Sequence, residues 1–169
     1  MAKKDKDPTA VELLTQQHRE VEELFEQYEG AATAKEKFEL FEEIADQLAI
    51  HAKIEEEFFY PAVRAKKTED MVLEAFVEHI SVKRLLADLL DNEPEDPTFD
   101  AQMKVLKEQI EHHVEEEENQ LFPAAKKVLS RDELVAVAQD MLALQTELQS
   151  TDPRNSIPIE LATSQPVAP

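Results

Sequence analysis

The sequence contains no cysteine and no tryptophan, and only one of its 169 residues is glycine. Without cysteine the chain can form neither disulfides nor thiolate metal sites, and it has no thiol redox chemistry. Scarce glycine, combined with abundant alanine, leucine, glutamate and lysine, favours helices over sheets. These absences predict an all-α protein whose chemistry depends on side chains other than thiols.

Basic charge and long apolar runs are also lacking. The 38 acidic and 18 basic residues give a formal net charge of −20, which disfavours binding to the phosphates of nucleic acids. The acidity alone is more typical of a solvated helical surface than of a metal site. No stretch is apolar over the eighteen residues that a membrane span requires, and the N-terminal segment lacks the apolar part of a secretory signal. We therefore expect a cytoplasmic protein that binds neither nucleic acid nor membrane.

Local signals indicate where the helices begin and end. Capping boxes mark three helix starts, at Thr9 with Glu12, Thr33 with Glu36, and Ser130 with Glu133. Another helix is expected from Thr68 or Glu69, and a further one follows the proline-containing loop at 91–97. Gly30 is placed to end the first helix in a left-handed turn.

These signals predict an antiparallel up-down-up-down four-helix bundle with an additional C-terminal helix packed on its outside. The bundle and the fifth helix, which ends near Leu148, occupy residues 9–149. Residues 1–8 are expected to form a flexible N-terminus. Residues 150–169 are rich in proline and are expected to form a disordered tail.

One stretch of the chain occurs twice. HAKIEEEFFYP, at 51–61, and HVEEEENQLFP, at 113–123, each carry a histidine, a glutamate four residues later and a proline six residues after that glutamate. Two further histidines, His18 and His79, precede these copies by similar distances. The two halves, at about 9–66 and 69–129, are expected to be related by a pseudo-twofold axis. The prolines are expected to kink their helices.

Six polar residues occupy positions that the helical periodicity assigns to the core: His18, His51, Glu55, His79, His113 and Glu117. A single histidine on an apolar stripe is more often a hydrogen-bonded core residue than a metal ligand. One His-x-x-x-Glu pair is also expected by chance in so acidic a chain. Two copies in the same register, however, would bury two carboxylates and four imidazoles without partners. Imidazole and carboxylate together suit transition-metal ions, so the pattern predicts a dinuclear metal site.

A competing pair lies one residue away in the second copy, because His112 is followed by Glu116 at the same spacing. The apolar stripe and the position of Pro123 favour His113 over His112. Tyr60, just before the first proline, is expected to contribute amphipathic packing rather than a hydrogen bond to the site.

The segments LLTQQHREVEELF, AIHAKIEEEFFYPAV, VEHISVKRLL and EHHVEEEENQLFPAAKK resemble the hemerythrin-like, or HHE cation-binding, domain. The resemblance covers residues from about 12 to 129 and implies a non-haem di-iron site inside a four-helix bundle. It implies His18 and His51 on one iron, His79 and His113 on the other, and Glu55 and Glu117 bridging the two. Each iron would keep room for an oxo or hydroxo bridge and for an external ligand.

Two positions depart from oxygen-carrying hemerythrins, so reversible oxygen carriage is not implied. Glu117 stands four residues after its histidine, where those proteins have an aspartate at five, and Lys83 replaces a further histidine. If Lys83 faces the site, it leaves an open iron position and its ammonium could serve catalysis, by donating to a bound oxygen species or pairing with Glu117. In the alternative, Val82 faces inward and Lys83 reaches solvent.

Two functions of different classes follow from these observations. The first is a di-iron protein that binds or reacts with O2, NO or peroxide, for sensing, detoxification (including peroxide breakdown) or iron buffering. The second is a metal-stabilised interaction module, whose acidic surface or tail binds a protein partner that the sequence does not identify.

Overall fold

The computed structural model describes residues 7–163, and every regular element in that range is helical. In chain order these elements are α1 (Ala10–Gly30), α2 (Ala34–Ile54), η1 (Glu55–Phe59), α3 (Tyr60–Val63), α4 (Glu69–Leu90), α5 (Pro97–Glu116), η2 (Glu117–Leu121), α6 (Phe122–Val128), α7 (Arg131–Leu148), η3 (Pro153–Ser156) and α8 (Ile157–Thr163). The segments η1 and η2 are π-helical turns, and η3 is a 3-10 turn. The prediction of an all-α fold is confirmed.

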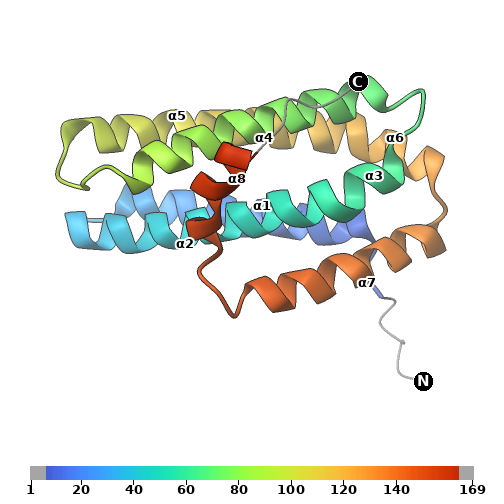
Figure 1. Cartoon of the computed structure of the whole chain (residues 1–169), viewed down its shortest axis with the longest axis horizontal. Coiled ribbons are helices and arrows are strands. Elements are labelled where there is room, and N and C mark those ends of the chain that lie inside the picture. Colours follow the sequence, from blue (N-terminus) through green and yellow to red (C-terminus); the bar gives the residue numbers. More distant parts are fainter. Residues whose placement is uncertain (1–6, 164–169) are drawn as a thin grey trace.

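Four long helical runs lie side by side along the long axis of the molecule (Figure 1). They are α1, then α2 with η1 and α3, then α4, and finally α5 with η2 and α6. α1 contacts α2, and α4 contacts α5, while α4 also contacts α2 and η2. Consecutive runs are joined at alternate ends, so neighbours are antiparallel (Figure 1). This is the expected up-down-up-down four-helix bundle.

The helix starts follow the capping signals of the sequence. Thr9, Thr33 and Ser130 each form a complete capping box with the glutamate three residues later. The expected left-handed turn at Gly30 is wrong, because Gly30 stays helical and has no positive φ. The next residue, Ala31, is extended, and its N–H donates to the carbonyl of Tyr28 at 3.2 Å, so the helix end is satisfied without a left-handed residue.

The two long helices that contain Pro61 and Pro123 leave α-helical geometry just before those prolines. In η1 the amide of Tyr60 donates to the carbonyl of Glu55, and in η2 the amide of Phe122 donates to the carbonyl of Glu117. Each bond spans five residues instead of four. Proline has no N–H to continue a regular ladder, which explains a wide turn at this place in both halves.

The apolar core consists of two clusters that flank the middle of the bundle. One contains Leu14, Ile54 and Phe59, and the other contains Phe25 and Leu48. The apolar residues before and after each inward-facing histidine on α1 and α4 belong to different clusters. A polar layer therefore crosses the bundle between two apolar ones.

The C-terminal part of the chain corrects one prediction. α7 packs on the outside of the bundle against α1, α2 and η1, as expected. Residues 153–163, expected to be disordered, instead form η3 and α8, which contact α2 and α4 respectively. Ile157 is fully buried, and the Arg154 guanidinium pairs with Asp46 and Glu42 on α2. The buried Pro153 and Ile157 and the doubly paired Arg154 attach this segment to the bundle, although its composition resembles that of a linker.

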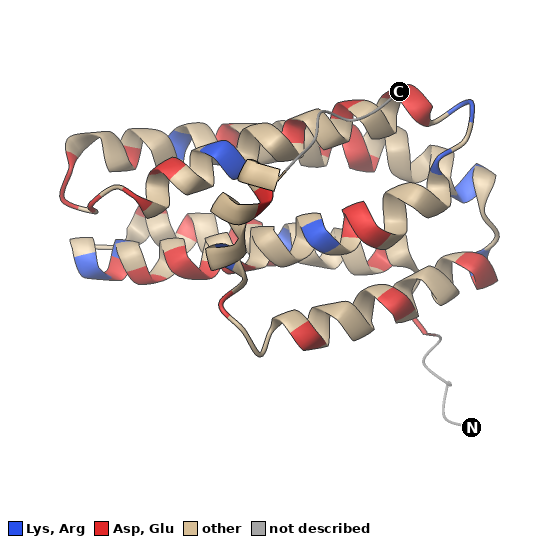
Figure 2. Cartoon of the chain, in the orientation of Figure 1, with Lys and Arg blue, Asp and Glu red and all other residues tan. Residues whose placement is uncertain are grey.

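The remainder of the predicted tail, 164–169, and residues 1–6 of the predicted flexible N-terminus lie outside the described residues. In the described part of the chain no helix has the length and apolar character needed to cross a bilayer. Acidic side chains are distributed over all the long helices (Figure 2).

Candidate metal centre

Four imidazoles and two carboxylates meet in the polar layer halfway along the bundle. They come from six different elements: His18 (α1), His51 (α2), Glu55 (η1), His79 (α4), His113 (α5) and Glu117 (η2). None is more than 7% exposed. The structure therefore brings together every residue that the sequence suggested as a metal ligand.

The Nε2 atoms of the four rings point toward the carboxylates. Nε2 of His51 and Nε2 of His79 each lie 3.3 Å from Oε2 of Glu55. The corresponding distances to Oε2 of Glu117 are 3.3 Å from His18 and 3.5 Å from His113. Each carboxylate thus lies between two imidazoles, one from its own helical run and one from another.

Each ring is held from behind through its other nitrogen. The pairs are His18 Nδ1 with Glu118 Oε1 at 2.9 Å, His51 Nδ1 with Gln17 Oε1 at 2.7 Å, His79 Nδ1 with Glu56 Oε1 at 2.9 Å and His113 Nδ1 with Glu78 Oε2 at 2.7 Å. Because these oxygens only accept, each Nδ1 donates to its partner and each Nε2 faces inward. All four rings are thereby presented as metal ligands.

The supporting residues repeat with the same symmetry as the ligands. The residues just before His18 and His79, which are Gln17 and Glu78, hold the rings at 51 and 113. The residues just after the two central glutamates, at 56 and 118, hold the rings at 79 and 18. The sequence analysis did not predict these supporting residues, although each stands next to a ligand and at an equivalent position in the two copies.

Tyr60 breaks the symmetry and corrects the expectation that it only packs. Its buried hydroxyl donates to Oε1 of Glu117 at 2.8 Å and lies 3.1 Å from Nε2 of His79. In a regular α-helix a residue five positions after Glu55 would point about 140° away from it. The wide turn η1 reduces that angle, so Tyr60 and Glu55 face the same centre. At the equivalent place Phe122 stacks on the ring of His18, with centroids 5.7 Å apart.

Burial and mutual charge set the protonation of the centre. Burial raises the pKa of Glu55 well above its usual value, and the charge of Glu117 adds to the effect. Burial acts in the same direction on Glu117, but the imidazoles of His113 and His18 outweigh it, so the pKa of Glu117 is lowered. Burial, followed by the two carboxylates, raises the pKa of Tyr60 and keeps it a hydroxyl. In the metal-free pair the negative charge is therefore favoured on Glu117 over Glu55.

Several ligand atoms have no hydrogen-bond partner within the described residues: Nε2 of His18, Oε1 of Glu55 and Oε2 of Glu117. Orphaned polar atoms at such depth are costly unless something else satisfies them. Potential ligand atoms form two sets, each within 4.8 Å of one another, and the sets are His18, His51, Glu55 and Glu117, and Glu55, His79 and His113. The side chains present therefore fit a pair of metal ions that share a carboxylate.

The two open questions of register are answered by the geometry. On α5 it is His113 that faces the centre, while the His112 side chain is 64% exposed.

On α4, Lys83 and Val82 are both buried, so the structure matches neither the expectation that only Lys83 faces inward nor the expectation that only Val82 does. Nζ of Lys83 donates to both carboxylate oxygens of Glu56 at 2.9 Å and lies 3.0 Å from Glu160 of α8. The expected pairing of Lys83 with Glu117 is absent from the contacts of the described residues, and Lys83 supports the residue that holds His79.

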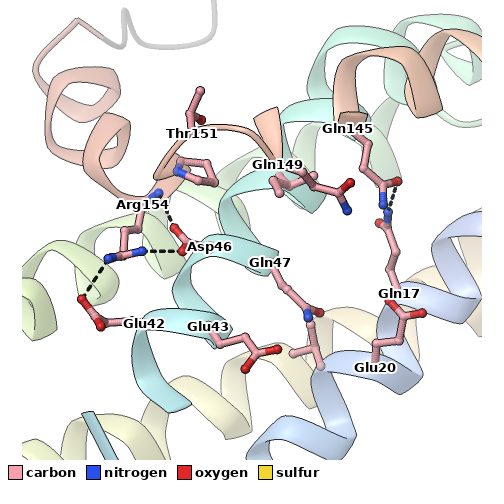
Figure 3. Close-up of a pocket in the computed structure, with 13 residues that line it drawn as sticks. Gln17, Glu20, Glu42, Glu43, Asp46, Gln47, Gln145, Gln149, Thr151 and Arg154 are labelled. Atoms are coloured by element: carbon pink, nitrogen blue, oxygen red, sulfur yellow. Dashed lines mark hydrogen bonds and ion pairs between the residues drawn. The ribbon is translucent and has the colours of Figure 1, made fainter. Parts of the chain in front are cut away.

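A cavity of about 530 Å³ lies behind the first half of the centre, between α1, α2, α7 and the segment leading to α8 (Figure 3). Gln17 forms part of its wall and separates it from His51. The Gln17 amide also donates to Gln145 of α7 at 3.0 Å. The outer side of the first half is therefore covered by α7.

The profile of the hemerythrin HHE cation binding domain matches residues 9–125. The chain belongs to this family. A crystal structure of a hemerythrin HHE cation binding domain-containing protein from Mycobacterium kansasii is similar to this HHE domain with a TM-score of 0.75 and 27% identity, over 93% of this chain and 94% of that one.

Two curated relatives are each 29% identical to this HHE domain. An uncharacterized protein of Mycobacterium tuberculosis matches over 70% of this chain and 73% of its own length. A DNA nickase of Nostoc sp. matches over 85% of this chain, which spans only 41% of the length of that protein.

Proposed function

We propose that this HHE domain holds two iron ions and binds or reacts with a small ligand, namely O2, NO or peroxide. His18 and His51 would bind one ion, His79 and His113 the other, and Glu55 and Glu117 would bridge them together with an oxo or hydroxo group. The observation that carries this proposal is the inward direction of all four Nε2 atoms, each ring being held through Nδ1 by a carboxylate or amide oxygen. Iron would supply Lewis acidity and electron transfer at the position where the small ligand binds.

The size of the adjoining space supports a small ligand. A cavity of about 20 Å³ borders the centre and is lined by Gln17, His18, Val21, Leu48, His51, Ile110, His113 and Val114. This volume is comparable to that needed for one water molecule. Its walls would exclude larger substrates, while a diatomic molecule or peroxide fits.

The residues around the ligands would orient them and neutralise the centre. Glu56, held by Lys83, fixes the ring of His79, and Glu118, paired with Arg19, fixes the ring of His18. We do not extend DNA nicking to this domain, because it spans a minor part of the nickase and its net charge of −20 opposes the approach of phosphates.

The adjacent histidines of α5 provide a matched test. His113→Ala should abolish the absorption of an oxo-bridged ferric pair and lower the iron content of the purified protein well below two per chain. His112→Ala should leave that absorption unchanged, because its ring points away from the centre. The measurements are elemental analysis and near-ultraviolet absorption of iron-supplied protein, with and without added NO or peroxide.

A content of about one ion per chain, or mainly zinc, would contradict the di-iron proposal. Two irons whose spectrum does not respond to any of the small ligands would favour a metal that only stabilises the fold, as in an interaction module.

A further inference from the structure

The sequence repeat of the two halves points to a second group of metal-ligating side chains at the surface. In the first half, Leu13, Ile50 and Ile54 are buried under α7 beside Gln17. The equivalent positions of the second half, 61 or 62 residues later, carry Glu74, His112 and Glu116 beside Glu78. In the first half these positions are apolar and covered by α7. In the second half the equivalent positions carry an imidazole and carboxylates, and no described helix covers them.

The geometry of this face is close to that of a metal site. Nε2 of His112 lies 3.4 Å from Oε1 of Glu116 and 3.7 Å from Oε1 of Glu78. Their ligand atoms all lie within 4.8 Å of one another. Ligands around a tetrahedral zinc ion are about 3.3 Å apart, as follows from bond lengths of about 2.0–2.1 Å. His112 and Glu116 share one helical face at four-residue spacing, so only small side-chain movements are needed.

Crowding of like charges makes the face receptive to a cation. Oε1 of Glu78 and Oε1 of Glu116 both lie within 3.7 Å of Nε2 of His112. Glu78 uses its other oxygen to hold the ring of His113, so its position is fixed from the interior. On an ordinary solvated acidic face, an imidazole is not expected to lie between two neighbouring carboxylates.

We propose that Glu78, His112 and Glu116 bind a divalent transition-metal ion at the surface and pass such ions to the buried centre. The first part is independent of the proposed function, and the second part rests on it. A small cavity of about 20 Å³ lies between α4 and the junction of α5 with η2, and its lining includes Glu74, Glu78, Glu116 and the central Glu117. A succession of carboxylates leads from the surface ligands to the bridging one. The shared Glu78 also couples the surface ion to the ring of His113.

Nitrogen-15 NMR of the histidine rings tests the binding site directly. Metal-free protein is titrated with Zn²⁺, and the ring resonances of His112 should shift at the same Zn²⁺ concentration as those of His51 or at a higher one, because ions pass only to a site that binds them at least as tightly. In Glu116→Gln the affinity reported by His112 should fall about tenfold, because one charged ligand is lost. Glu115→Gln, which removes the same charge from the next residue of α5, should leave that affinity within about twofold.

The outcomes separate the two proposals. Ring resonances of His112 that do not shift with Zn²⁺, or that shift at the same Zn²⁺ concentration in both glutamate variants, would overturn the surface site. A response of His112 with none from His51 would uphold the surface site and overturn both the delivery of ions and the buried metal centre.

Delivery is tested by stopped-flow loading of metal-free protein with Fe²⁺ under anaerobic conditions. Glu116→Gln and His112→Asn should take up iron about tenfold more slowly than wild type, yet reach the same final content. Glu115→Gln should load at the wild-type rate. Equal rates in all four proteins, or equal slowing in Glu115→Gln and Glu116→Gln, would overturn the delivery role.

Discussion

At the scale of single residues, the hydroxyl of Tyr60 and the two central carboxyls determine the properties of the metal-free centre. The hydroxyl donates to Glu117, the carboxyl with the lowered pKa, so it stabilises the charged member of the pair. Glu55, fully buried, is the member that retains a proton. Each of these features can be tested by an isosteric substitution.

Tyr60→Phe removes one hydroxyl and leaves a buried carboxylate oxygen short of a donor. We expect the free energy of unfolding of the metal-free protein to fall by about 2 kcal/mol. Tyr28→Phe is the matched control, because its hydroxyl also donates to a carboxylate, Asp100 at 2.7 Å, in a half-buried place. The control should lose about 1 kcal/mol or less in the same urea titration. Equal losses would show that the central position of Tyr60 adds nothing.

Glu55→Gln should make the metal-free protein more stable at pH 8. The folded-state pKa of Glu55 is raised, so its stabilising proton is bound at low pH and the contribution is lost as pH rises through that pKa. The amide of glutamine is neutral at every pH, so the variant keeps this contribution to the free energy of unfolding. With chelator present, the variant should unfold at a higher urea concentration than wild type at pH 8 and at a similar one near about pH 4.5.

The control for this experiment is Glu57→Gln, which removes a charge from the exposed side of the same turn, where the carboxylate pairs with Lys53 at 3.1 Å. The difference between the urea midpoints of Glu57→Gln and wild type should be the same at both pH values. A Glu55→Gln variant no more stable than wild type at pH 8 would contradict the buried neutral carboxyl.

At the scale of elements, α8 is linked to the centre although it lies on the outside of the bundle. Glu160 of α8 contacts Lys83, Lys83 donates to Glu56, and Glu56 holds the ring of His79. The apolar anchor of this connection is Ile157, whose side chain packs into the cluster that contains Leu86. A segment that resembles a tail thus becomes part of the support of a ligand.

Ile157→Ala and Ile159→Ala compare a buried and an exposed isoleucine of the same helix. Ile157 is fully buried and Ile159 is 66% exposed. The first substitution should lower the free energy of unfolding by about 2–4 kcal/mol, because it leaves a cavity between α8 and the bundle. The second should change it by less than about 0.5 kcal/mol. Similar unfolding midpoints for the two variants would mean that α8 is not anchored as described.

At the scale of the whole molecule, the bundle carries a polar layer between two apolar clusters and a net charge of −20. Both features oppose the compact state in the absence of cations, since the layer has unpaired ligand atoms and the surface charges repel one another. Ions bound by the proposed centre would therefore stabilise the fold as a whole.

Removal of both metal ions should lower the melting temperature of the wild-type protein by about 10–20 °C. This follows because ions at about a hundredfold excess over Kd add about 2.7 kcal/mol per site to the folded state. Differential scanning calorimetry with and without chelator measures the shift. His51→Ala, with one ligand missing, should melt below the loaded wild type and respond little to chelator. A wild-type melting temperature that is independent of chelator would contradict a tightly held metal.

The sequence by itself determined the bundle, the helix starts and the six converging residues. Capping boxes are local, and the ligands repeat in a register that helical periodicity converts directly into one inward face. These features depend on residues a few positions apart, and regular helix geometry relates them without knowledge of the fold. His113 could be chosen over His112 for the same reason.

Only the tertiary structure decided the partners of those ligands. Gln17 meets His51, and Glu78 meets His113, across helices that are distant in the sequence. Tyr60 enters the centre because a π-helical turn departs from the regular period, which no pattern based on that period can anticipate. The segment at 153–163 is ordered by contacts with α2 and α4 rather than by its own composition. In each case the deciding energy comes from groups that only the folded chain brings together.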